Sequence, residues 1–149
     1  MYKNWIIMLM LGLMVVMAQC GETSKASGGG QLKGHNIVIQ ISDDNARTKK
    51  IALNNAANVL KEWPQANIEI VAYGPGIGIM FRGKKNKFRN RVKELSMNNI
   101  RFSACGNTMR HVAKKKGRMP KLLKGVKQVK AGVKRIVELQ EKGYSYIRP

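Results

Sequence analysis

From residue 34 onward the apolar positions alternate between two spacings. Short apolar or alternating runs, typical of strands, occur at 35–42, 67–73, 99–105, 125–130 and 144–147. Between them, apolar residues recur at helical spacing over 46–63, 87–97, 107–116 and 131–142. Strands that alternate with helices predict βαβ units, so we expect a single α/β domain with a mostly parallel sheet and helices on both faces.

The first strand and its helix carry the clearest local signals. Ile37–Ile41 is almost wholly apolar, as in a strand buried on both faces. Ser42, Asp43 and Asp44 follow it and suit the start of the first helix, which Pro64 ends. Near the other end of the chain, Gly143 stands where a glycine commonly ends a helix.

The N-terminal segment is predicted to be a targeting sequence. Lys3 precedes fourteen uncharged, mostly apolar residues, 5–18, whereas a membrane-spanning helix needs about 20. We therefore expect a signal peptide over 1–18, a flexible Gly- and Ser-rich linker over 19–34 and a folded domain over 35–149. The protein is then exported and periplasmic, either soluble after cleavage before Gln19 or lipid-anchored through Cys20. An uncleaved membrane anchor is the remaining alternative.

Composition narrows the chemistry. The chain has 149 residues, 28 Lys and Arg against 8 Asp and Glu, and a net charge of +20. Two cysteines and two histidines exclude a disulfide scaffold and a zinc site, so no metal and no cofactor are predicted. The few scattered acids also leave little for glycosidase or triad chemistry.

The positive charge concentrates in two stretches. The first basic cluster comprises Arg82, Lys84, Lys85, Lys87, Arg89, Arg91 and Lys93, and the second comprises Arg110, Lys114, Lys115, Lys116, Arg118, Lys121 and Lys124. Such surfaces attract anionic partners or anionic membrane surfaces. The alternative is a basic surface that only contacts solvent, which has the same sequence pattern. No aromatic residues are interleaved as stacking platforms, so nucleic acid is not an expected partner.

Cys105 is the strongest candidate for chemistry. It ends the strand 99–105, whose apolar residues alternate with polar ones, and Gly106 follows it. Asn107 or Thr108 is expected to cap the next helix, which would favour a thiolate at Cys105. Arg110 and His111 follow within about two turns and could assist as cations or as a base. The alternatives are a cysteine that only packs and a histidine that is only solvated.

A glycine-rich turn follows the second strand. Gly74, Gly76 and Gly78 form a G-x-G-x-G pattern, which is not a dinucleotide fingerprint. We expect a tight turn that shapes the pocket near Cys105, with an anion cradle of backbone N–H groups as the alternative.

Four segments carry a family resemblance: ACGNT at 104–108, VAYGPGIGI at 71–79, LNNAANVL at 53–60 and GYSYIRP at 143–149. Together they resemble the DsrE/DsrF-like family over about residues 36–149. The resemblance implies a Rossmann-like three-layer domain, assembly into trimers or hexamers and a role in sulfur metabolism. It also implies that Cys105 matches the cysteine that carries a persulfide in the relay members.

Two functions remain open at this point. One is a sulfur carrier or thiol-reactive protein that works through Cys105 with sulfur donor and acceptor proteins. The other is a non-catalytic oligomeric binding module whose basic surface recruits an anionic partner or membrane surface. In both cases we expect a sulfur carrier or binding protein rather than an enzyme that turns over a substrate.

Overall fold

The computed structural model describes residues 34–149. The predicted signal peptide 1–18, the linker up to residue 33 and Cys20 lie outside the described residues. In the part of the chain that is described, no helix is long and apolar enough to span a bilayer.

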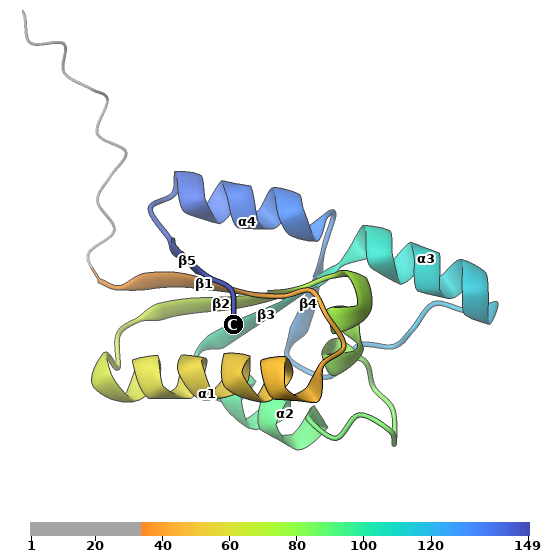
Figure 1. Ribbon diagram of the computed structural model, residues 1–149, viewed down its shortest axis with the longest axis horizontal. Coiled ribbons are helices and arrows are strands. Elements are labelled where there is room, and N and C mark those ends of the chain that lie inside the picture. The colour runs from red at the N-terminus through yellow and green to blue at the C-terminus, as the bar shows by residue number, and fades with distance from the viewer. Residues whose placement is uncertain (1–33) are drawn as a thin grey trace, which may run out of the picture.

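A five-stranded parallel sheet forms the centre of the domain, with the order β4-β3-β2-β1-β5 (Figure 1). The strands are β1 Asn36–Ile41, β2 Asn67–Ala72, β3 Ile100–Cys105, β4 Val126–Val129 and β5 Ser145–Ile147. Every residue of β1 is buried, as its apolar run predicts. The parallel α/β prediction is confirmed.

The helices form two layers around this sheet. The described helices are α1 Ala46–Glu62, α2 Arg89–Met97, α3 Gly106–Lys116 and α4 Gly132–Glu141, with the 3-10 helix η1 Gly74–Met80 after β2. Figure 1 shows α1 and α2 on one face, α4 on the other, and α3 projecting past the end of the sheet. Helices on both faces are confirmed, but one of the two faces carries a single helix.

The two faces of the sheet are packed very differently. Alternate residues of the central strands, such as Ile39, Ile70 and Phe102, lie in the large apolar core with residues of α1 and α2. The opposite face has a small apolar cluster of Val38, Val71, Ile136 and Leu139 beneath α4. Apolar packing alone therefore holds α4 less firmly than it holds α1.

The helix α1 starts at Ala46, as predicted, but its capping residue differs from the expected ones. Its N-cap is Asn45, whose side-chain oxygen accepts a hydrogen bond from the Arg47 N–H at 2.7 Å. Asp43 accepts one from the Asn45 N–H at 2.9 Å, and Asp44 pairs with the buried Lys49. The residues expected to cap the helix therefore precede its actual N-cap, Asn45. Asp43 and Asp44 instead make contacts that support the turn leading into the helix.

A buried carboxylate reinforces the face under α4. Glu69 in β2 is 1% exposed and accepts hydrogen bonds from the Ser103 hydroxyl at 2.7 Å and from Arg135 Nε and Nη2 at 2.8 and 2.7 Å. Arg101 Nε adds a longer contact at 3.3 Å. Burial raises the pKa of Glu69, but hydrogen bonds from Arg135 and Ser103 and the two guanidinium charges outweigh it, so the pKa is lowered. The carboxylate thus ties β2, β3 and α4 together.

Replacing Glu69 by Gln should lower the free energy of unfolding at pH 7 by about 1–3 kcal/mol, because Arg101 and Arg135 lose their counter-charge. The loss is moderate because water reaches both guanidinium groups. A lowered pKa stabilises the fold above the unfolded carboxyl value of about 4.3, and that contribution disappears as the pH falls through the folded value. The difference between parent and variant should therefore shrink in acid. Urea unfolding of parent and variant at pH 7 and at a pH below the unfolded carboxyl pKa measures this difference.

Glu141→Gln is the matched control, since Glu141 is an exposed carboxylate at the end of α4, the helix that carries Arg135. It should leave the unfolding free energy nearly unchanged. A Glu69→Gln curve that superimposes on the parent curve at pH 7 would mean that the network contributes no stability.

Candidate functional site

Cys105 lies where β3 passes directly into α3. It is the last residue of the strand and the N-cap of the helix, and it is 5% exposed. Its neighbours Phe102 and Ala104 belong to the large core, as their alternation predicts. The predicted position, at the carboxyl end of a strand beside a helix start, is thus the observed one.

The surroundings of the sulfur favour the thiolate. Burial raises the pKa of Cys105, but the Thr108 hydroxyl and the backbone N–H groups of Thr108, Gly132 and Asn107 can donate to the thiolate and outweigh it, so the pKa is lowered. No side-chain cap occupies the first-turn N–H groups of α3. These groups remain available to a charge on the sulfur.

A second helix start completes this set of donors. Gly132 opens α4, and a Cβ at this position would lie 3.2 Å from Cys105 Cβ and 3.0 Å from Tyr73 Cβ. A glycine lets the α4 backbone come this close without crowding the side chains of Cys105 and Tyr73. The N-terminal ends of α3 and α4 therefore converge on one sulfur, which the sequence patterns did not predict. A glycine at position 132, shortly after β4, was the one local sign of a close approach there.

The expected cap of α3 was wrong. The helix begins at Gly106, where a Cβ would lie 2.9 Å from the Val129 carbonyl oxygen, so neither Asn107 nor Thr108 is the N-cap. Thr108 Oγ1 instead accepts a hydrogen bond from the Gly74 N–H at 3.1 Å, besides reaching the sulfur. The side-chain oxygen of Asn107 accepts a hydrogen bond from Arg110.

Arg110 and His111 lie on the exposed surface of α3. The groups that lower the Cys105 pKa are a hydroxyl and backbone N–H groups, and neither of these two side chains is among them. Activation of the thiol in this structure is therefore a matter of oriented dipoles.

The predicted glycine turn forms η1. Gly74 has a φ of +52°, which favours glycine, and a Cβ on Gly76 would lie 2.6 Å from the Ile41 carbonyl oxygen, a contact that only glycine avoids. Gly74 reaches the Cys105 site through Thr108, whereas Gly78 lines a groove on another side of η1. The anion cradle stays a prediction.

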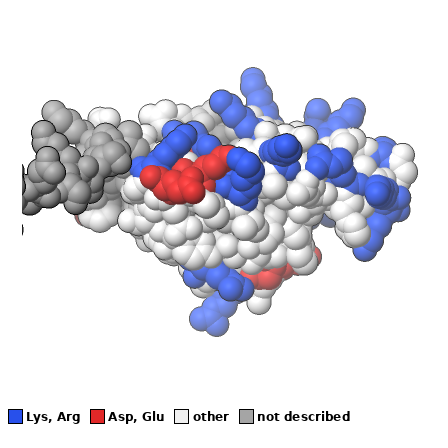
Figure 2. All heavy atoms as spheres, turned by 90° about the horizontal axis from the view of Figure 1, so that it is seen from above, with Lys and Arg blue, Asp and Glu red and all other residues white. Residues whose placement is uncertain are grey.

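Basic residues are spread over much of the surface and are dense at one end. Figure 2 shows many Lys and Arg side chains at the end where α3 projects, and others across the rest of this face. Among residues 34–149, no group of His, Cys, Asp and Glu side chains could hold a metal ion.

The sheet order and the thiol at its carboxyl edge define a small α/β protein with a candidate nucleophilic cysteine. Residues 35–149 match the DsrE/DsrF-like family, and the chain belongs to this family. No curated protein matches the chain.

Solved structures share the fold. A protein of unknown function from Methanobacterium thermoautotrophicum, MTH1491, is 33% identical with a TM-score of 0.69, over 77% of this chain and 99% of that one. The ychN protein of E. coli is 11% identical with a TM-score of 0.60, over 78% and 99% of the two chains. BT1422 of Bacteroides thetaiotaomicron, also of unknown function, is 14% identical with a TM-score of 0.51, over 76% and 94%.

The pH dependence of Cys105 alkylation should show a lowered thiol pKa, with a midpoint below that of an ordinary exposed cysteine measured in the same way. Thr108→Val removes the hydroxyl and should raise that midpoint, slowing iodoacetamide alkylation at pH 7 about three- to tenfold. Peptide mass spectrometry assigns the label to Cys105 in the full chain.

Thr108→Ser is the control, because serine keeps the hydroxyl that contacts both Gly74 and the sulfur. It should restore the parent profile. A Thr108→Val profile identical to that of the parent would show that the Thr108 hydroxyl does not act on the sulfur.

Proposed function

We propose that the protein carries sulfur as a persulfide on Cys105. The observation that carries the proposal is the set of N–H and hydroxyl donors around this sulfur, at the meeting point of two helix starts. Membership of the DsrE/DsrF-like family supports a sulfur-relay-related role for the chain as a whole.

In the loading step, the Cys105 thiolate attacks the outer sulfur of a donor persulfide, R–S–SH. A new S–S bond forms to Cys105, the donor S–S bond breaks, and R–S⁻ leaves with that electron pair while the proton stays on the transferred sulfur. In the unloading step, an acceptor thiolate attacks the outer sulfur and Cys105 leaves as a thiolate. The same donors that lower the Cys105 pKa stabilise this leaving thiolate.

Assembly and location belong to the same proposal. Val133 and Val137 stand one turn apart on the outer side of α4, 57% and 46% exposed, and such a stripe suits contact with a further copy of the chain. Family resemblance points to a trimer or hexamer. Export, with a soluble or Cys20-anchored form, rests on the N-terminal sequence pattern alone.

The test is intact-mass and peptide-mass spectrometry of the full chain after incubation with glutathione persulfide. We expect the parent and Cys20→Ser to gain sulfur on the Cys105 peptide, with loss of that sulfur on adding a reductant. The double variant Cys20→Ser/Cys105→Ser, which has no cysteine, should gain none. A parent protein whose Cys105 stays unmodified and resists alkylation would identify a packed structural cysteine and overturn the proposal.

A further inference from the structure

The two basic clusters, far apart in the sequence, meet in the fold. Phe81 and Leu122 form an antiparallel bridge, with the Arg82 N–H donating to the Lys121 carbonyl at 2.7 Å and the Leu123 N–H to the Met80 carbonyl at 2.9 Å. All of the first basic cluster except Arg91 then lines one groove with Lys116, Arg118, Lys121 and Lys124 of the second. The groove has a volume of about 1630 Å³.

The charge of this groove is almost wholly uncompensated. Asp44 is the one acidic residue in its described lining, and it is paired with Lys49. Among residues 34–149, the ion pairs found elsewhere include Arg91 with Glu94 but no groove residue of either basic cluster. Cations facing one another across a concave surface reinforce each other's field and attract negative charge.

We call the two basic stretches that line the groove, 82–93 and 116–124, its walls, and apolar side chains line the same groove. The lining includes the half-buried Phe81, Phe88 and Leu122, and Met119, which is 50% exposed. A ligand that satisfied only the charges would leave this apolar surface in water. Methionine adapts its shape readily to a bound side chain. The lining therefore suits a ligand that carries both carboxylate and apolar groups.

Size and shape select the class of ligand. Small-molecule sites usually enclose about 300–1000 Å³, less than this groove, so a single phosphate or metabolite would fill it poorly. Phe81 and Phe88 are partly covered and offer few faces for stacking nucleic-acid bases. A flat lipid surface would meet the rim of the groove, whereas a peptide segment can reach its floor.

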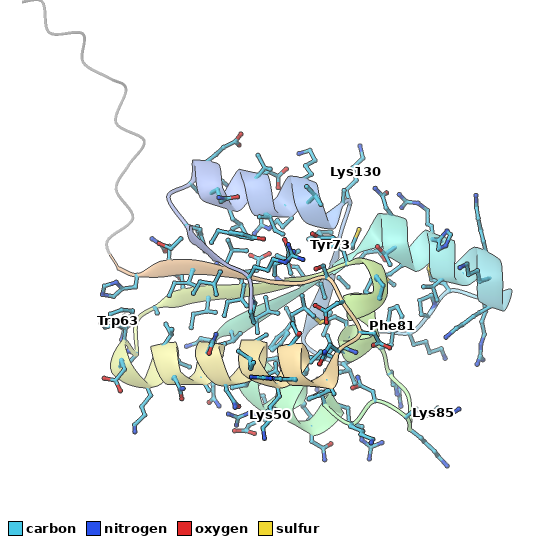
Figure 3. The ribbon with its side chains drawn as sticks, in the orientation of Figure 1. Lys50, Trp63, Tyr73, Phe81, Lys85 and Lys130 are labelled. Carbon is cyan, nitrogen blue, oxygen red and sulfur yellow. The ribbon has the colours of Figure 1, made fainter. Side chains whose placement is uncertain are left out.

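We propose that this groove binds an acidic segment of a partner protein. Carboxylates of the segment pair with lysines and arginines of the walls, and its apolar side chains lie on the floor around Phe81 and Leu122. Figure 3 shows Phe81 and Lys85 on the same side of the domain, away from Lys130, which lies beside α4. The proposal does not depend on the reactivity of Cys105.

The test measures fluorescence anisotropy of a labelled peptide that alternates Glu with Leu, at near-physiological salt. Lys85→Glu/Lys121→Glu reverses one charge on each wall and should weaken binding about tenfold or more. Lys130→Glu/Lys142→Glu makes the same change in net charge outside the groove and should keep the affinity within about twofold of the parent.

Three comparison ligands separate the alternatives. A peptide with Ser in place of Leu should bind more weakly than the Glu–Leu peptide, because the apolar side chains of the groove then stay exposed to water. For the protein variants, an equal loss of binding in the two double variants would mean that only net charge matters, and it would overturn the proposal. Stronger binding of single-stranded DNA or of phosphatidylglycerol vesicles than of the Glu–Leu peptide would overturn it as well.

Discussion

The ion pair between Glu69 and Arg135 holds the site together. The face of the sheet under α4 has only a small apolar cluster, so packing contributes little to the position of this helix. Arg135 grips the buried carboxylate with two hydrogen bonds and stands three residues after Gly132. Fixing Arg135 against β2 therefore fixes the first turn of α4 against Cys105, and a carboxylate at the centre of the sheet sets the surroundings of a thiol at its edge.

Lowering of the Cys105 pKa by a hydroxyl and main-chain N–H groups suits the proposed carrier role better than a neighbouring base would. A carrier must release its sulfur as readily as it accepts it, so its thiolate has to be stable but still nucleophilic. N–H groups and a hydroxyl lower the pKa without taking the proton themselves. The low exposure of the residue limits access to small donors or to a partner's extended tip.

Sequence patterns predicted the parallel sheet, its helices and the place of Cys105. These features follow from the spacing of apolar residues and from turn residues, both of which are local properties of the sequence. Three features escaped them. Gly132 reaches the sulfur through the packing of α4. Glu69 is a single acid in a mostly apolar strand. The basic clusters meet through the Phe81–Leu122 bridge. The cap of α3 was misplaced because Gly106 packs against the Val129 carbonyl and lets the helix begin at once.

The contact between Gly74 and Thr108 links two parts of the domain. Gly74, the first residue of η1, donates its N–H to the hydroxyl beside Cys105, and Met80, the last residue, accepts a hydrogen bond from the Leu123 N–H in the segment that lines the groove. The Cys105 site and the basic groove therefore lie at the two ends of one seven-residue helix. A single short segment of the chain thus borders both the thiol and the basic surface.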